Sequence, residues 1–331
     1  MADYDYWLPE QAIAQEPAEP RDAARLLIAT GPEVQHAHVR DLPDHVRPGD
    51  LLVVNDTRVL PARLHLRKPT GGAAEVLLLE PEGDGWAALV RPGRRLPPGT
   101  TLLAPDGTPV VEIGASHDDG ASRHVRILSE PWAYGEIPLP PYLRRGLADP
   151  ERYQTVYADR PGSVAAPTAG LHLTPSVLDG CRARGAELAR VELVVGLDTF
   201  RPVTVEDPAD HVMHSESYRV PPATWEACTR TRAAGGRVIA VGTTTVRALE
   251  SAAASGRLDG RTSLFVRPPF DFAVVDVLLT NFHLPRSTLL LMVEAFVGPR
   301  WRDLYGTALG ADYRFLSFGD AMLLARHEVS R

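Results

Sequence analysis

The chain has 331 residues, of which 44% are hydrophobic and 23% charged, and its formal net charge is −7. This composition is typical of globular proteins, and the length exceeds one ordinary core, so two domains or a domain with an insertion are expected. The chain contains no apolar run of 18 residues to cross a membrane, and its acidic start does not resemble a secretion signal. Two isolated cysteines, Cys181 and Cys228, favour a reducing compartment over a disulfide framework. The sequence therefore predicts a cytoplasmic protein without a membrane segment.

Basic residues gather in one third of this acidic chain. They occur in "RLHLRKP" at 63–69, "RPGRR" at 91–95 and "YLRRG" at 142–146. The negative net charge argues against a protein coated in nucleic acid, because phosphate contacts need clustered cations. A local basic face remains compatible with it, and an ordinary solvated surface explains each cluster equally well.

The first third of the chain is rich in predicted strands. Residues 50–60, "DLLVVNDTRVL", predict a hydrophobic strand that ends in polar residues. From 73 to 128, short strand-like runs alternate with turn sequences such as "EGDG" and "PDG". Many short strands at a spacing of roughly ten residues are typical of a small barrel or sandwich.

The rest of the chain alternates between strands and helices. The segment "TPSVLDGCRARG" predicts a helix with Thr174 as N-cap and Pro175 at its first position, and "AELARVELVVGL" predicts the strand that follows. The segment "GRVIAVGTTTVRALESAAASG" predicts a strand, a turn and a helix that ends at Gly256. A further strand, "FAVVDVLLTNF", precedes a helix in "STLLLMVEAFVG".

Together these patterns predict the domain organisation. Apolar strands that alternate with helices indicate a sheet buried on both faces. We therefore expect a mixed-sheet α/β domain formed by 1–59 and 151–331, with a β-barrel domain inserted at 60–150.

The turn "VGTTTVRALES" (241–251) leads from a predicted strand into a predicted helix. A helix N-terminus presents free N–H groups and a positive dipole end, which favour a carboxylate or phosphate. Arg247, one turn further on, can pair with a carboxylate. Threonine capping of an ordinary helix is the alternative interpretation.

Two other loops combine small or polar residues with a histidine. In "GSVAAPTAGLHLTP" (162–175), small residues allow a ligand to approach the backbone, and His172 can titrate near neutral pH. In "LLTNFHLPRST" (278–288), an amide, an aromatic ring, an imidazole and two hydroxyls follow a strand. A tight structural loop with a surface histidine also fits the first segment.

Two more segments place acidic residues near strand or helix ends. In "NDTRVLPARL" (55–64), Asn55, Asp56 and Arg58 follow a buried strand, where open α/β sheets place ligands, although an internal Asp–Arg pair explains them too. In "YRFLSFGDAMLL" (313–324), Asp320 precedes an apolar segment that we expect to be helical, and it can cap that helix.

A metal site is not expected. The segment "ADHVMHSESYRV" (209–220) contains a His-x-x-His pair, but no matching cluster of ligands accompanies it and no cysteine is near. The sequence also lacks a Ser-His-Asp signature, a Walker loop and a glycine-rich dinucleotide fingerprint.

Taken in order, these segments resemble the S-adenosylmethionine:tRNA ribosyltransferase-isomerase family of queuosine biosynthesis. The markers are "VVNDTRVLPARL", "GEIPLPPYLRR", "ERYQTVYA", "APTAGLH", "DTFRPV", "HVMHSE", "VGTTTVRALES", "LLTNFHLPRSTLLLMV" and "RFLSFGDAM". The resemblance extends from "LPEQAIAQEPAEPRDAARLL" to "YRFLSFGDAML", which is nearly the whole chain. It implies an α/β domain with an inserted β-barrel, as the patterns do.

The resemblance also implies a reaction. The ribosyl part of S-adenosylmethionine moves onto the aminomethyl group of a deazaguanine base, preQ1, in a tRNA anticodon, and it becomes the epoxycyclopentane ring of epoxyqueuosine. Adenine and methionine leave. The sulfonium acidifies the neighbouring ribose carbon, so the protein supplies a base, an acid for adenine and orientation. S-adenosylmethionine is a co-substrate, no metal or separate cofactor is implied, and a monomer is expected.

Carried onto these motifs, the resemblance implies catalytic roles for His172, His283 and Asp56. It implies substrate binding by residues of the loops and of the last motif, which are Asn55, Arg58, Thr168, Gly170, Thr243, Thr244, Thr245, Arg247, Asn281, Phe282 and Asp320. Binding of tRNA is expected of Arg94, Arg95, Arg144 and Arg145. Phe282 would stack on adenine or face the sulfonium, Asn281 would read adenine or a ribose hydroxyl, and His283 would exchange a proton or support a neighbour.

The chain departs from the family pattern in three places. The usual "LHVGLGTFRPV" reads "ELVVGLDTFRPV" here, so Val194 replaces a histidine and Asp198 a glycine, and Pro269 stands for a glycine in "VRPPF". Two alternative functions stay open, the first of which is favoured by this altered segment and by the acidic net charge. One is a related enzyme that uses S-adenosylmethionine on a deazapurine acceptor outside tRNA. The other is an RNA-binding protein that has lost catalysis.

Overall fold

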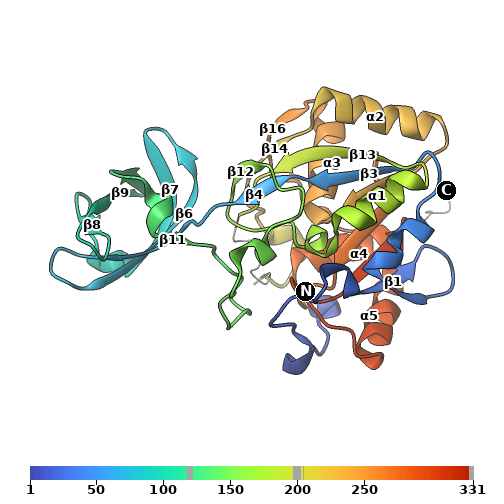
Figure 1. Cartoon of the computed structure of the whole chain (residues 1–331), viewed down its shortest axis with the longest axis horizontal. Coiled ribbons are helices and arrows are strands. Elements are labelled where there is room, and N and C mark those ends of the chain that lie inside the picture. The colour runs from blue at the N-terminus through green and yellow to red at the C-terminus, as the bar shows by residue number, and fades with distance from the viewer. Residues whose placement is uncertain (118–121, 197–202, 204, 328–331) are drawn as a thin grey trace. The chain divides into compact units, whose positions relative to one another are not determined.

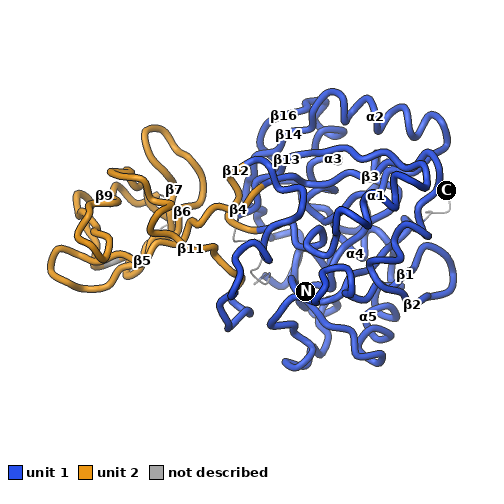
Figure 2. The backbone as a smooth tube through the Cα atoms, viewed as in Figure 1, with its two compact units in different colours: residues 1–57, 141–160, 166–331 blue, residues 58–140, 161–165 orange. Residues whose placement is uncertain are grey.

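The structure is a computed structural model, and it describes residues 1–117, 122–196, 203 and 205–327. Contacts within the chain divide it into two compact units (Figure 2). The first contains residues 1–57, 141–160 and 166–331, and the second contains 58–140 and 161–165. The boundaries near residues 60 and 150 were predicted for independently folding domains, and they stay a prediction.

The first unit is built on a sheet that has nine strands in the described part of the chain (Figure 1). In spatial order they are β16 (Asp259–Thr262), β14 (Glu216–Arg219), β13 (Glu187–Leu193), β3 (Leu51–Asn55), β15 (Val238–Val241), β17 (Val277–Asn281), β18 (Ala321–Ala325), β1 (Arg25–Ala29) and β2 (Gln35–His38). Strands β13, β3, β15 and β17 run parallel, whereas β18 is antiparallel to β17, and the outer strands β14, β16 and β2 pair antiparallel with their neighbours. The predicted mixed-sheet α/β fold is confirmed.

Five α-helices accompany these strands among the described residues: α1 (Pro175–Ala183), α2 (Pro222–Ala233), α3 (Thr243–Ser255), α4 (Thr288–Val297) and α5 (Trp301–Gly310). The predicted cap of α1 is confirmed, because the Val177 N–H donates to Thr174 Oγ1 at 3.3 Å. Gly256 ends α3 in the left-handed conformation, as predicted. Helices α2 and α5 are not among the predicted elements. Helix α2 buries only small or hydroxyl-bearing side chains, such as Ala227 and Thr231, so it lacks the apolar stripe that marks a helix in a sequence.

Short 3₁₀ helices occupy many of the connections. In the first unit they are η1 (Ala2–Tyr4), η2 (Glu10–Ala12), η3 (Arg21–Ala23), η4 (Val39–His45), η7 (Pro150–Tyr153), η8 (Thr168–His172), η10 (Pro208–Asp210) and η11 (Gly298–Arg300). Within the described residues, none of the helices has the length and apolar character needed to cross a bilayer.

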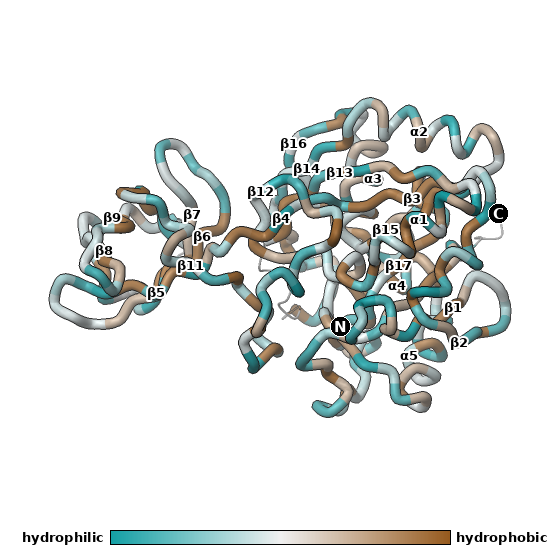
Figure 3. Tube along the Cα trace, in the orientation of Figure 1, coloured by the Kyte–Doolittle hydropathy of each residue, from teal (hydrophilic) through white to brown (hydrophobic). Residues whose placement is uncertain are grey.

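The central strands are apolar because both of their faces are covered. Every residue of β3, β15 and β17 is buried. Helix α1 packs Val177, Leu178 and Cys181 into a core that contains Leu52 and Ile239 of the sheet. Helices α2 and α3 contact β3, β13 and β15, and α4 contacts β18. In Figure 3 these central strands are largely hydrophobic along their length, as burial on two faces requires.

One predicted element is wrong. The apolar segment after Asp320, expected to be a helix, is strand β18, which lies between β17 and β1. Four of its five residues are buried. An apolar run that short has no helical or alternating period, so its sequence does not distinguish a buried strand from a piece of a buried helix.

The second unit is a β-barrel. Its ring consists of β5 (Arg63–Arg67), β6 (Ala73–Glu82), β7 (Gly85–Arg91), β10 (Ser122–Ile127), β9 (Pro109–Ser116) and β8 (Thr101–Leu103), paired in that order. Arg67 pairs with Leu103, which joins β8 back to β5 and closes the ring. On β5 the side chains alternate, with Leu64 and Leu66 buried and His65 exposed, as expected for a barrel wall. The predicted β-barrel is thereby confirmed.

The remaining elements are short. Strand β11 (Gly135–Glu136) pairs with β5 outside the ring, and β4 (Thr57–Val59) pairs with β12 (Arg160–Ser163). The 3₁₀ helices η5 (Gly93–Arg95) and η6 (Pro131–Tyr134) lie in the second unit.

Candidate active site

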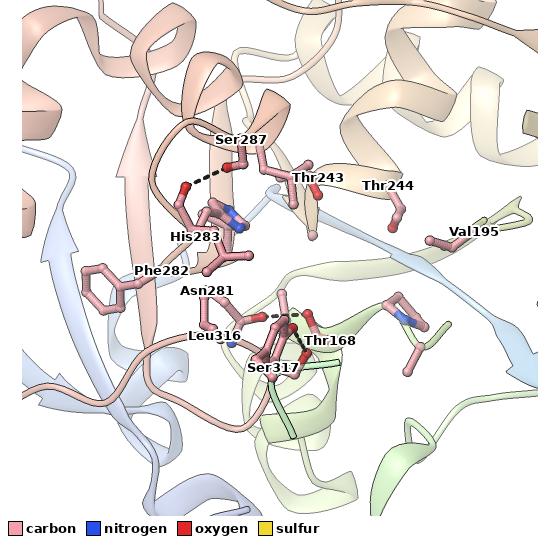
Figure 4. Close-up of a pocket in the computed structure, with 18 residues that line it drawn as sticks. Thr168, Val195, Thr243, Thr244, Asn281, Phe282, His283, Ser287, Leu316 and Ser317 are labelled. Carbon is pink, nitrogen blue, oxygen red and sulfur yellow. Dashed lines mark hydrogen bonds between the residues drawn. The ribbon is translucent and has the colours of Figure 1, made fainter. Parts of the chain in front are cut away.

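A pocket of about 620 Å³, part of it open to solvent, lies in the first unit (Figure 4). It is lined by the segments 166–169, 242–244, 280–284 and 316–317, together with Tyr142, Val195, Ser287 and Leu289. The segments 242–244 and 280–284 follow the neighbouring parallel strands β15 and β17. The pocket therefore lies beyond the carboxyl ends of these strands, where open α/β sheets bind ligands.

Three of the four loops with implied substrate-binding residues meet in this pocket. They are the segments "PTAGLH", "GTTTVR" and "TNFHLP". The fourth, "NDTR", follows β3 and contributes no residue to the described lining. Among the described lining residues none is Asp, Glu, Lys or Arg, so the wall is built from hydroxyls, one amide, one imidazole and apolar groups.

A chain of hydrogen bonds links Thr168, Asn281 and His172. Thr168 Oγ1 donates to Asn281 Oδ1 at 2.9 Å, and Asn281 Nδ2 donates to His172 Nε2 at 3.0 Å. Asn281 Nδ2 also donates to the backbone carbonyl oxygen of Asp320 at 3.4 Å. Because the side-chain amide makes these hydrogen bonds in this orientation, Asn281 is held at the pocket wall with its oxygen toward Thr168 (Figure 4).

His172 lies behind this wall and does not itself line the pocket. Its side chain is buried, and this burial, followed by the positive charges of Arg314, Arg21 and Arg152, lowers its pKa to about 3. The imidazole is therefore neutral at pH 7 and accepts the Asn281 N–H on Nε2. The position found for His172 is suited to orienting Asn281.

His283 does line the pocket. The ring atom Nε2 lies 2.9 Å from Thr280 Oγ1. The backbone N–H of His283 donates to the Tyr305 hydroxyl at 3.0 Å, and the backbone carbonyl accepts a hydrogen bond from the Tyr6 hydroxyl. Burial lowers its pKa to about 3, so this imidazole is also neutral at pH 7. A neutral imidazole in the wall can accept a proton or a hydrogen bond from a ligand.

The ring of Phe282 belongs to an aromatic cluster. It stacks on Phe315 with ring centroids 4.7 Å apart and makes edge contacts with Tyr305 and Tyr313. The residue is fully buried, and Figure 4 shows the ring pointing away from Thr243 and Thr244. In this structure the ring packs against these aromatic side chains at the end of β17, and its stacking on adenine stays a prediction.

The three threonines at the start of α3 differ in their surroundings. Thr243 and Thr244 line the pocket, and the buried Thr244 hydroxyl has no hydrogen-bond partner in the described structure. Thr245 is not among the lining residues, since its hydroxyl donates to the Val241 carbonyl at 2.8 Å.

Other predicted residues maintain the fold around the pocket. Asn55 ties β3 to β13, because its Nδ2 donates to the Leu193 carbonyl at 3.0 Å. The Asp320 carboxylate accepts hydrogen bonds from the backbone N–H groups of Arg25 and Arg314, each at 2.8 Å. A Cβ on Gly170 would meet the Tyr157 hydroxyl oxygen at 1.9 Å, so a glycine is needed there. None of these three lines the pocket.

Asp56 is a buried carboxylate outside the pocket. Its Oδ2 lies 3.8 Å from Arg190 and 3.9 Å from Arg160, while Oδ1 has no hydrogen-bond partner in the described structure. Burial, followed by Glu192, raises the pKa of this carboxyl. A raised pKa marks functional and structural carboxylates alike, so the catalytic role of Asp56 stays a prediction.

Arg247 lies in a second, smaller cavity. It is buried and forms an ion pair with Glu216, which also accepts the Gly196 N–H at 3.0 Å and pairs with His214 at 2.9 Å. Burial lowers the pKa of the guanidinium to about 10. The cavity of about 280 Å³ that this side chain lines is otherwise mainly apolar, with Phe265 among its residues.

The arginines predicted to bind tRNA belong to both units. Arg144 and Arg145 are exposed in the first unit, and they pair with Glu10 and Glu16, the latter at 3.0 Å. Arg95 is exposed in η5 of the second unit, whereas the side chain of Arg94 lies outside the described structure. Arg58 is part of β4 and does not line the pocket.

Three departures from the family pattern have different positions. The Val194 N–H donates to the Ser217 carbonyl at 2.9 Å, next to the lining residue Val195. Pro269 follows a cis peptide bond after Pro268. Asp198 lies outside the described residues.

Sequence reasoning missed several lining residues. Tyr142 and Ser317 share a hydrogen bond of 2.7 Å between their hydroxyls, and Val195 and Leu316 add apolar wall. Tyr142 and Ser317 lie in the quoted segments "GEIPLPPYLRR" and "RFLSFGDAM", so the only signal was membership of a marker segment. Within the described residues, no group of three or more His, Cys, Asp or Glu side chains is placed to hold a metal ion.

Comparisons with known proteins cover nearly the whole chain. The family model described as "Queuosine biosynthesis protein" matches residues 1–324. A protein of Thermus thermophilus named S-adenosylmethionine:tRNA ribosyltransferase-isomerase is 52% identical, over 97% of this chain and 98% of its own length. A protein of the same name from Azoarcus is 51% identical, over 99% and 98%. The crystal structure of S-adenosylmethionine tRNA ribosyltransferase from Thermotoga maritima matches with a TM-score of 0.57 and 36% identity, over 97% of this chain and 99% of that one.

Proposed function

Because the chain belongs to the queuosine biosynthesis protein family, we propose that it is an S-adenosylmethionine:tRNA ribosyltransferase-isomerase. It transfers the ribosyl part of S-adenosylmethionine to the aminomethyl group of preQ1 in tRNA and isomerises it to epoxyqueuosine. Adenine and methionine are released. The observation that carries this proposal is 52% identity with a relative of that name along 97% of this chain and 98% of the relative.

The pocket supports the proposal by its location and chemistry. It lies at the carboxyl ends of β15 and β17, and its wall presents neutral polar groups from Thr168, Asn281 and His283. These groups suit the hydroxyls and ring nitrogens of a nucleoside. His283 carries the imidazole of the wall, and burial raises the pKa of the lining phenol Tyr142, so His283 is the candidate for moving a proton during the reaction.

For His172 we propose a positioning role in place of the catalytic role that the family resemblance implies. Because His172 accepts a hydrogen bond from Asn281 behind the wall, it acts by holding this amide, and proton transfer falls to His283. A test is the pair His172→Gln and His172→Ala. Glutamine keeps an acceptor for the amide, so it should retain more turnover than alanine. Equal turnover in the two variants would contradict this role.

We also propose that S-adenosylmethionine is a co-substrate and that the reaction needs no metal or separate cofactor. The tRNA partner would contact exposed arginines such as Arg95, Arg144 and Arg145. Arg95→Glu should weaken tRNA binding and reduce its salt dependence, because each phosphate contact adds about one ion to the salt slope. A monomer in the cytoplasm completes the proposal.

A second acceptor class is favoured by one observation, which is Val194 in place of the family's histidine beside the lining residue Val195. The alternative acceptor is a deazapurine nucleoside that is not part of tRNA. The deciding experiment incubates the protein with S-adenosylmethionine and three acceptors: preQ1-containing tRNA, the same tRNA with guanine, and the free preQ1 nucleoside. Adenine release with the first alone supports the proposal. Release with the free nucleoside alone establishes the alternative, and S-adenosylmethionine binding without release in any mixture indicates lost catalysis.

A further inference from the structure

The N-terminus of α3 opens into the pocket without a side-chain cap. Its N-cap residue is Gly242, at φ 89°, a conformation that L side chains rarely adopt. The Gly242 N–H donates to the Leu279 carbonyl at 2.8 Å. The next two N–H groups, of Thr243 and Thr244, precede the first intrahelical bond, which joins the Val246 N–H to the Gly242 carbonyl at 3.3 Å. They have no acceptor among the residues the structure describes.

The hydroxyl of Thr244 adds a third unsatisfied group at this place. The residue is 9% exposed and lines the pocket, and its Oγ1 is buried without a hydrogen-bond partner in the described structure. Buried hydroxyls are normally paired, because an unpaired one loses its bond to water and gains nothing in return. The neighbouring Thr245 shows the usual solution, since its hydroxyl donates to the Val241 carbonyl at 2.8 Å.

We propose that the start of α3 and the Thr244 hydroxyl bind the carboxylate of the methionine part of S-adenosylmethionine. The inference rests on the proposed function, which makes this compound the ribosyl donor. The two N–H groups, the Thr244 O–H and the positive end of a helix of 13 residues all favour an anion, and a carboxylate has lone pairs for three donors.

The absence of charged side chains among the described lining residues favours the carboxylate of this ligand over a phosphate of tRNA. No Lys or Arg stands among the described lining residues, so the pocket supplies no cation to neutralise a phosphate. S-adenosylmethionine has a sulfonium and an ammonium group of its own, which offset its carboxylate within the same molecule. Its binding therefore leaves no unpaired negative charge in this uncharged wall, whereas a nucleotide phosphate does.

The experiment compares two adjacent threonines. Thr244→Val removes the unpaired hydroxyl at nearly constant volume, and Thr245→Val is the matched control, because its hydroxyl bonds to Val241 and its side chain does not line the pocket. Titration calorimetry measures the binding of S-adenosylmethionine and of its decarboxylated form, which keeps the sulfonium, ribose and adenine. Unfolding midpoints are measured alongside.

We expect Thr244→Val to weaken S-adenosylmethionine binding by about tenfold or more, because a hydrogen bond to a charged group has about that effect. Binding of the decarboxylated compound should stay within about twofold, and the unfolding midpoint should be unchanged or higher, since an unpaired buried hydroxyl is removed. Thr245→Val should lower the midpoint and leave both affinities unchanged.

Three results would overturn the inference. Unchanged binding of S-adenosylmethionine in Thr244→Val would mean that water satisfies the hydroxyl. Equal weakening of both ligands would show that the hydroxyl contacts the nucleoside part. If tRNA is titrated into the same variant, weakened tRNA binding with normal S-adenosylmethionine binding would identify a phosphate as the bound anion. A wild type that binds no S-adenosylmethionine would instead refute the proposed function, and the inference with it.

Discussion

Two buried histidines should make the stability of this protein fall in mild acid. His172 and His283 are 3% and 8% exposed, and burial lowers the pKa of each to about 3 from a usual value of 6.5. The unfolded chain binds a proton at each site below about pH 6.5, whereas the folded chain does so only below about pH 3. The free energy of unfolding therefore decreases as pH falls through 6.5 and levels off near 3.

The size of the effect follows from the pKa difference. A pH of 5.0 lies about 1.5 units below the pKa of a histidine in the unfolded chain, and one unit corresponds to about 1.4 kcal/mol. Each buried histidine therefore lowers the free energy of unfolding at pH 5.0 by about 2 kcal/mol. The two together remove about 4 kcal/mol between pH 7.5 and 5.0. Since folded domains are stable by only about 5–15 kcal/mol, this loss is easily measured.

Urea unfolding at pH 7.5 and 5.0 provides the assay, with His172→Gln, His283→Gln and the double variant compared with wild type. Each single variant should lose about 2 kcal/mol less than wild type between the two pH values, and the double variant about 4 kcal/mol less. The control is His38→Gln at an exposed position, which reports the effect of the same exchange outside the two buried sites. If both single variants lost as much stability in acid as wild type, these imidazoles would not be buried and neutral, and the reasoning would be refuted.

Three further predictions concern the same region. The low pKa of His283 predicts that no ionisation near pH 6.5 assignable to this residue governs kcat, and a limb near that pH that disappears in His283→Gln would contradict this. Gly170→Ala should lower the unfolding free energy by about 1–3 kcal/mol in thermal melts, because its Cβ would overlap the Tyr157 hydroxyl, and adding Tyr157→Phe should recover much of the loss. Glu216→Gln should cost about 3–5 kcal/mol by leaving the Arg247 charge buried without a counter-ion, and a drop below about 1 kcal/mol in urea unfolding would show that solvent reaches the guanidinium.

The helices with clear end signals were predictable from the sequence. Thr174 caps α1 and Gly256 ends α3, because a hydroxyl oxygen and a glycine satisfy the geometry of helix ends through local interactions alone. Strand β18 and helix α2 were not predictable in the same way. The five apolar residues of β18 have no diagnostic period, and α2 buries small side chains whose pattern resembles an exposed segment.

The position of the pocket was predictable only in part. Loops that follow parallel neighbours such as β15 and β17 meet at one edge of a sheet, which is why the motifs after these two strands lie together. Strand β3 also neighbours β15, yet Asn55 at its end turns to the backbone of β13 and takes its loop out of the lining. That choice depends on which strand lies on the other side of β3, and the spacing of residues in the chain does not reveal strand order.

The segment "GTTTVR" explains why a motif identifies a family more readily than it assigns roles. Successive residues of an α-helix point about 100° apart, so neighbours in the sequence necessarily face different surroundings. Thr243 and Thr244 face the pocket, Thr245 bonds back to β15 through the Val241 carbonyl, and Arg247 reaches a separate cavity and Glu216. Four polar side chains within five residues, which are equivalent candidates in the sequence, thus divide into ligand-facing and structural groups by rotation about the helix axis. The Thr245 hydroxyl already donates its proton to a backbone carbonyl and has none left for a substrate, whereas the unpaired Thr244 hydroxyl at the pocket wall can donate to one.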